Sequence, residues 1–141
     1  MNLLAFHVII CWMDVEQVVQ YWMTTAQDDL KSIHVCMRAG DYVKALFWGH
    51  VYPEKLLKAI ITKQTGKHAP YGHTLSALAA RANLQLQPEQ IELLERVTQY
   101  SIQARYPDHK FRLKKLATRA YCLREVKQIE EFGKWLKSML K

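Results

Sequence analysis

The sequence predicts an all-α protein, an antiparallel, up-and-down bundle of four or five helices. Two observations predict it: apolar residues recur at three- and four-residue spacing from Val15 onward, and short segments rich in Gly, Pro or Asp separate the periodic stretches. The length of 141 residues, half of them apolar, fits one compact domain. Disordered, collagen-like and multidomain proteins are therefore excluded.

The first two predicted helices are joined by a tight turn. Asp14 and Gln17 have the spacing of a capping box, and the apolar periodicity that follows ends at Gly40. Asp41 can cap a second helix, whose apolar stripe continues to residue 60. Pro53 removes one amide donor in the middle of that helix, so we expect a kink or a short break there.

Three further helices are predicted in the second half of the chain. Residues 65–72 form the clearest loop, because they combine Gly and Pro with little periodicity. A short helix covers about 73–82, a fourth begins at Pro88, and a fifth covers about 112–139. The inward-facing positions in the last two helices are predicted to include Ile91, Leu94, Val97 and Ile102, then Leu113, Leu116, Ala120 and Leu123.

The N-terminal residues differ from the rest. Residues 1–12 form an apolar extension, and residues 13–141 are expected to form a single helical domain. The apolar stretch Leu3–Met13 has eleven residues, too few to span a membrane, and lacks the features of a secretory signal. We therefore expect a cytoplasmic protein without membrane contact. Its three cysteines are widely spaced, which favours reduced core residues over disulfides or a zinc site.

The net charge of +7 arises entirely from the C-terminal part of the chain. Residues 101–141 carry 11 basic and 4 acidic side chains, while residues 1–100 are balanced. A basic cluster follows the fourth helix and consists of Lys110, Arg112, Lys114, Lys115 and Arg119. It can attract a ligand that carries phosphate. The alternative is an ordinary solvated helix face.

The segment Arg105–His109 has side chains suited to a nucleotide. Arg105 offers a planar fork of donors for phosphate, Tyr106 a face for base stacking, and Asp108 an acceptor for a ribose hydroxyl. His109 can take a proton from an RNA 2′-hydroxyl while Arg105 stabilises the phosphorane, without a metal. Alternatively, Arg105 pairs with Asp108 or caps the next helix, and His109 is simply exposed.

Other candidate ligand-binding residues precede this segment. Lys55 and Lys58 lie three apart on one helix face and can add phosphate contacts, unless they are simple solvated lysines. His73, at a helix start, is expected to orient the loop. Neither Cys nor an acidic side chain neighbours the loop histidines, so we expect no metal site and no cofactor. Gly-rich phosphate loops, serine-hydrolase elbows and zinc-protease motifs are absent from the sequence.

Four segments in this order resemble the HEPN family, the nucleotide-binding domain of higher eukaryotes and prokaryotes, in its subgroup that carries the A-R-Y-P-D motif. They are Trp22 with Ala26 and Asp29, Gly40-Asp41-Tyr42 with Ala45-Leu46-Phe47-Trp48, Glu54-Lys55-Leu56-Leu57-Lys58-Ala59, and Ala104-Arg105-Tyr106-Pro107-Asp108. The resemblance implies four long helices with a short extra one, and a homodimer. It also implies either a nucleotide-binding module, often partnered with a minimal nucleotidyltransferase in a toxin-antitoxin-like system, or a metal-independent ribonuclease.

The spacing of Arg105 and His109 decides between these roles. Family ribonucleases carry Arg and His separated by four to six residues, whereas three residues separate them here. We therefore expect a homodimeric nucleotide-binding module, with a ribonuclease as the alternative. A third hypothesis is a structural interaction bundle whose basic helix binds an acidic protein. Phe47, Trp48 and Tyr52 lie outside the inward stripe and are predicted to form the apolar dimer interface.

Overall fold

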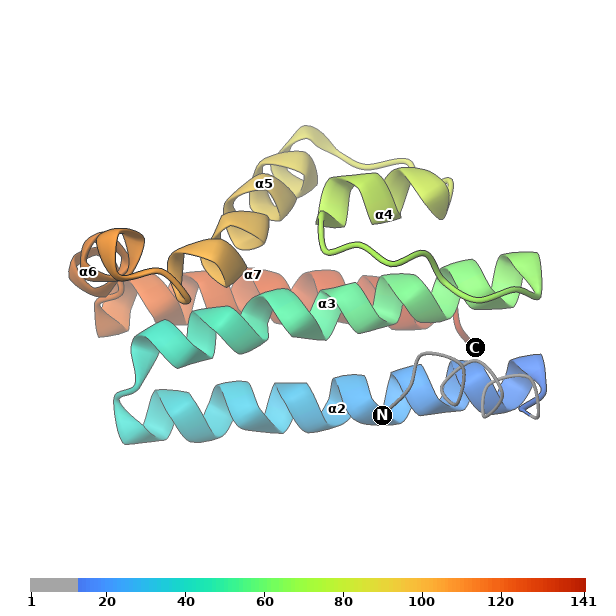
Figure 1. Cartoon of the computed structure of the whole chain (residues 1–141), viewed down its shortest axis with the longest axis horizontal. Coiled ribbons are helices and arrows are strands. Elements are labelled where there is room, and N and C mark those ends of the chain that lie inside the picture. Colours follow the sequence, from blue (N-terminus) through green and yellow to red (C-terminus); the bar gives the residue numbers. More distant parts are fainter. Residues whose placement is uncertain (1–12) are drawn as a thin grey trace.

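The computed structural model describes residues 13–141 (Figure 1), so the predicted extension 1–12 lies outside the described residues. Within residues 13–141 the chain is helical and has no strand, which confirms the predicted all-α bundle. The helices are α2 (Val15–Ala39), α3 (Tyr42–Thr65), α4 (Leu75–Arg81), α5 (Pro88–Gln103), α6 (Pro107–Leu116) and α7 (Arg119–Ser138). None of these helices combines the length and the apolar character needed to cross a bilayer.

Helices α2 and α3 form an antiparallel hairpin, as their caps predict. The backbone amide of Gln17 donates to Asp14 Oδ1 at 2.8 Å, and the Gln17 side chain accepts from the Asp14 amide, which completes the capping box. Gly40 ends α2 with φ of 74°, a left-handed conformation that suits glycine. The amide of Asp41 then donates to the carbonyl of Cys36 at 2.9 Å, which turns the chain back along α2.

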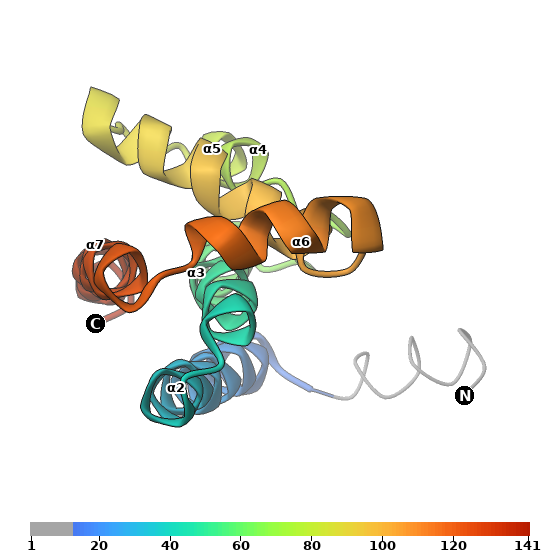
Figure 2. The same cartoon turned by 90° about the vertical axis from the view of Figure 1, so that its left-hand side faces the viewer.

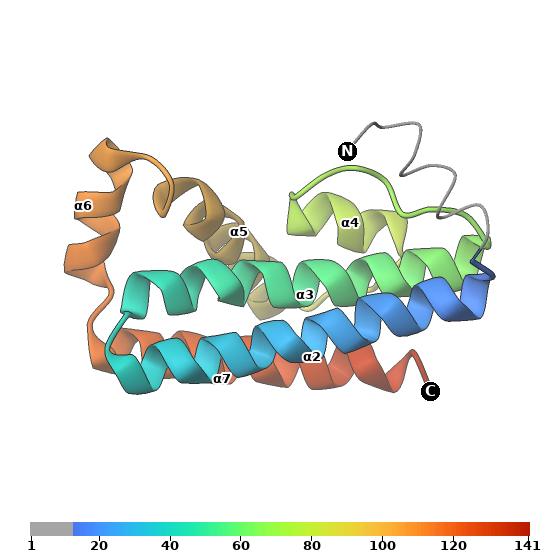
Figure 3. The ribbon, with the colours of Figure 1, turned by 60° about the horizontal axis from the view of Figure 1, so that its bottom comes forward.

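Helix α3 is the centre of the molecule and packs against every other described helix (Figures 1 and 3). In Figure 3, α2 and α7 lie side by side with α3, and α7 runs in the same direction as α3. The expected break at Pro53 is absent, because α3 is continuous from Tyr42 to Thr65. Pro53 is itself buried in the packed side of this helix.

Tyr52 corrects one part of the predicted interface. Its side chain is 1% exposed and packs against Gly133 of α7, where the missing Cβ leaves room for the ring. Phe47 and Trp48 are half-buried and form an edge-to-face pair with ring centroids 5.3 Å apart. The prediction that Tyr52 belongs to an apolar dimer interface is therefore wrong, because its side chain is buried in the core of the bundle.

The predicted fifth helix is wrong in its extent, because it consists of two helices. Helix α6 begins at Pro107 and ends at Leu116, and Thr118 caps α7 by accepting a hydrogen bond from the amide of Tyr121 at 3.2 Å. Helix α6 lies across the end of the bundle, above the start of α3 (Figure 2). The change of direction resets the helical phase, so a single continuous stripe is not maintained.

Several predicted inward positions are exposed. In the second half of the chain they are Ile91, Ile102, Leu116, Ala120 and Leu123. In α5 the predicted Leu94 and Val97 are buried as expected, and Leu93 and Tyr100 are buried as well, because α5 packs against α3, α4, α6 and α7. Leu113 is buried as expected.

Candidate functional site

One side of α3 carries three polar side chains at intervals of four residues, His50, Glu54 and Lys58, all buried. Lys58 Nζ donates to Glu54 Oε1 at 2.8 Å, and the two side chains are only 10% and 9% exposed. His50 Nδ1 lies 3.5 Å from Glu54 Oε2. Charged side chains are almost never buried without partners, so Lys58 and Glu54 form a neutral internal pair.

His73 joins this cluster from the connection between α3 and α4. Its Nδ1 donates to Glu54 Oε1 at 2.9 Å, and its carbonyl oxygen accepts from His50 Nε2 at 2.6 Å. Two hydrogen bonds therefore fix the backbone and the side chain of His73 to α3. The imidazole ring is nevertheless 71% exposed, so its Nε2 side remains open to solvent.

Burial and neighbouring charges determine the ionisation of His50. Burial lowers the pKa of His50 below its ordinary value, and the positive charges of His73 and Arg105 act in the same direction. The hydrogen bond to the His73 carbonyl and the charge of Glu54 oppose that shift. His50 is therefore neutral at pH 7, with its proton on the Nε2 atom that donates to His73.

Arg105 occupies the connection between α5 and α6. Its guanidinium carbon lies 5.5 Å from the centroid of the Phe47 ring, a cation–π contact. In the described part of the chain Arg105 is exposed and has no carboxylate within ion-pair distance. The alternative pairing of Arg105 with Asp108 is thus not found.

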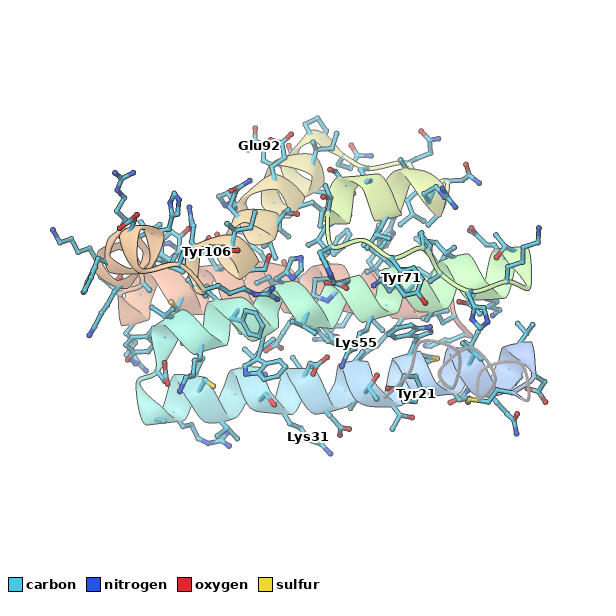
Figure 4. All side chains as sticks on the ribbon, in the orientation of Figure 1. Tyr21, Lys31, Lys55, Tyr71, Glu92 and Tyr106 are labelled. Atoms are coloured by element: carbon cyan, nitrogen blue, oxygen red, sulfur yellow. The ribbon has the colours of Figure 1, made fainter. Side chains whose placement is uncertain are left out.

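Tyr106, Asp108 and His109 lie beyond Arg105, at the start of α6. Figure 4 shows Tyr106 at the junction of α5 and α6, and its side chain is 58% exposed. Asp108 and His109 belong to the first turn of α6 and are exposed. The structure thus places Arg105 over Phe47, about one turn of α3 from His50 and its partner His73, with Tyr106 at the N-cap of α6 and with Asp108 and His109 in its first turn.

Both predicted lysines have carboxylate partners. Lys55 lies between α2 and α3 (Figure 4), with Nζ 2.7 Å from Asp29 Oδ2. Burial raises the pKa of Asp29, and Lys55 opposes that shift. Lys58 lies with Nζ 5.7 Å from the centroid of the Trp22 ring, in addition to its contact with Glu54. Neither lysine is the simple solvated side chain that the alternative interpretation expects.

The fold and this arrangement can be compared with known proteins. The HEPN domain family matches residues 19–139 of the sequence. The chain belongs to the HEPN domain family. Its structure is similar to the crystal structure of TT1696 from Thermus thermophilus, with a TM-score of 0.73, at 19% identity over 86% of this chain and 97% of that chain. No curated protein matches the sequence.

A second polar network in this HEPN domain fixes the helix that leads to Arg105. Glu125 of α7 is buried and accepts from Arg96 Nη2 at 3.0 Å and from Tyr100 Oη at 2.8 Å, both on α5. Tyr100 also contacts the hydroxyl of Tyr121. Burial is the largest cause that raises the pKa of Tyr100 far above its ordinary value, so the hydroxyl stays protonated.

Sequence reasoning missed the roles of His50 and Glu54. The signal was present, because polar residues at positions 50, 54 and 58 interrupt an apolar helix at intervals of one turn. The link from Glu54 to His73 spans 19 residues, and no local pattern predicts it. Within residues 13–141, no group of three or more His, Cys, Asp or Glu side chains is placed to hold a metal ion.

Proposed function

We propose that this HEPN domain is a nucleotide-binding module that holds the ligand's phosphate at Arg105. The supporting observation is that Arg105 is exposed and lacks a carboxylate partner among the described residues, whereas Lys55, Lys58 and Arg96 each have one. An arginine held against an aromatic ring keeps its donors oriented for a planar, bidentate contact with phosphate.

The neighbouring side chains complete the proposed site. Tyr106 provides an exposed face for base stacking, and Asp108 provides an acceptor for a ribose hydroxyl. Lys55 and Lys58 receive a different role from the one expected from sequence. Lys55 pairs with Asp29 of α2, and Lys58 pairs with Glu54 of its own helix while lying over the Trp22 ring of α2, so both position α3 relative to α2 instead of contacting the ligand.

Binding assays on purified variants test this function. Titration calorimetry with a panel of nucleotides and short RNAs should give at least a tenfold loss of affinity for Arg105→Ala, with an unchanged melting temperature. Tyr106→Ala should lose about 1–3 kcal/mol of binding free energy and Tyr106→Phe almost none. Arg81→Ala is the matched control, because Arg81 is exposed at the end of α4. No binding by the wild-type protein, or equal losses in both arginine variants, contradicts the proposal.

A metal-independent ribonuclease is the second candidate function. The observation that favours it is that Arg105 and His109 are both exposed and flank the start of α6. His109 would accept the proton of the RNA 2′-hydroxyl, and Arg105 would stabilise the charged phosphorane. Incubation of RNA with the protein in EDTA tests this role. Intact RNA, or cleavage that survives His109→Gln, rules it out.

Two further proposals concern partners. Apolar side chains exposed on α5, on α6 and at the turn between them support a homodimer; they are Ile102, Tyr106, Phe111 and Leu116. A light-scattering mass near 16.5 kDa at micromolar concentration would overturn it.

A minimal nucleotidyltransferase partner in a toxin-antitoxin-like pair is supported by the family resemblance, and co-purification of the two neighbouring gene products tests it. If neither nucleotide nor RNA binds, the third hypothesis applies, in which the domain is a structural bundle that binds an acidic protein through the basic helix α6.

A further inference from the structure

The His73 imidazole is fixed on one edge and open on the other. Glu54 accepts a hydrogen bond from Nδ1 at 2.9 Å, and this carboxylate is itself held by Lys58 at 2.8 Å. A carboxylate on one ring nitrogen sets the orientation of the ring. Nε2 of His73 is consequently presented to solvent in a fixed direction, as a ready hydrogen-bonding partner.

Arg105 lies near the same part of α3 as this open edge. Arg105 stacks on the Phe47 ring, and His50, about one turn further along α3, contacts the His73 backbone directly. The charges of Glu54 and Lys58 cancel within their buried pair, as do those of Asp29 and Lys55. Among the described residues of this region, the Arg105 guanidinium and the open edge of the His73 ring are therefore the groups left to bind an anion.

We infer that Arg105 and His73 together bind the terminal phosphate of a mononucleotide, a phosphate monoester. This inference rests on the proposed function and names its ligand class. The guanidinium fork engages two non-bridging phosphate oxygens. A monoester has a third such oxygen, which His73 Nε2 contacts, whereas a diester has only two. The pair thus selects a terminal phosphate over the backbone phosphate of RNA, and Glu54 is a positioning residue for His73.

Matched nucleotide pairs test the inference. Calorimetric titrations would use the four nucleoside 5′-monophosphates and their 3′,5′-cyclic forms, which share base and sugar but carry a diester. The wild-type protein should bind the preferred monophosphate at least tenfold more tightly than its cyclic form. His73→Gln should weaken monophosphate binding about tenfold and leave cyclic nucleotide binding within about twofold. We expect this variant to fold, because the ring is 71% exposed and Glu54 keeps its pair with Lys58.

Two more variants separate positioning from general structural effects. Glu54→Gln should reduce the ratio of monophosphate to cyclic affinity, because the ring of His73 loses its carboxylate partner. The ratio isolates this effect, since a loss of stability from the unpaired Lys58 weakens both affinities alike. His34→Gln is the control, since His34 is another histidine paired with a carboxylate, Glu130, on a different part of the molecule. It should change neither affinity.

The outcomes distinguish this inference from the proposed function. Equal affinity for both nucleotide forms, or equal weakening of both by His73→Gln, overturns the inference while nucleotide binding stands. Absence of all nucleotide and RNA binding overturns both. If 5′-phosphorylated RNA binds in a His73-dependent manner and mononucleotides do not, the ligand is an RNA end, and the assignment to a mononucleotide is wrong.

Discussion

The buried pair of Glu54 and Lys58 provides a quantitative test of the polar cluster on α3. Removing one member of a buried ion pair leaves an uncompensated charge and destabilises a protein by about 3–5 kcal/mol. Among the described residues, Glu54→Leu would leave Lys58 with only the Trp22 ring as a partner for its charge, in a side chain that is 10% exposed. We expect its free energy of unfolding to fall by that amount.

The opposite change should cost less. Lys58→Met leaves Glu54 with His73, whose imidazole can supply the compensating charge and hydrogen bond. The double variant Glu54→Leu/Lys58→Met replaces the pair by apolar side chains of similar volume, which is often close to neutral. It should therefore be more stable than Glu54→Leu alone by more than about 2 kcal/mol.

Urea unfolding followed by circular dichroism measures all four proteins and gives the coupling free energy of the cycle. The expectation is contradicted if Glu54→Leu costs less than about 1 kcal/mol, or if adding Lys58→Met brings no recovery. Either result would mean that water reaches Lys58 and that the pair is not buried in solution.

Three further predictions concern packing and ionisation. Gly133→Ala should lower the free energy of unfolding by about 1–3 kcal/mol, because the new Cβ would lie 2.7 Å from Tyr52 Cζ. The control Gly49→Ala should lower it clearly less, because its new Cβ would meet only the flexible end of the Ile129 side chain at 2.9 Å. Equal melting temperatures of the two variants would contradict this prediction. Burial raises the pKa of Tyr52 to about 12, so this tyrosine ionises first in the unfolded chain and the free energy of unfolding falls as the pH rises from about 10 toward 12. Tyr52→Phe should remove this part of the pH dependence of the free energy of unfolding, measured by urea unfolding. Burial also raises the pKa of Cys122 to about 11, so iodoacetamide at pH 8 should alkylate this thiol only after the protein unfolds, and mass spectrometry detects the added mass. Alkylation of Cys122 in the native protein would contradict this prediction.

Local sequence was sufficient for the features that depend on residues within one or two turns of each other. The capping box of Asp14 and Gln17, the left-handed turn at Gly40 and the start of α5 at Pro88 all lie where local chemistry predicts them. These signals require no tertiary partner, because a cap or turn is satisfied within about four residues. The all-helical class follows from the same local periodicity.

The way in which distant segments meet depends on tertiary packing. The periodicity at the end of the chain fits one helix, yet packing of α6 across the bundle requires a change of direction at Ala117 and Thr118. Likewise, Tyr52 is a core residue because Gly133 on α7 leaves room for its ring. His73 could be singled out in the sequence, but its carboxylate partner Glu54 could not, since their contact depends on how the loop folds back over α3. Contacts across such separations are set by packing, which a linear pattern does not encode.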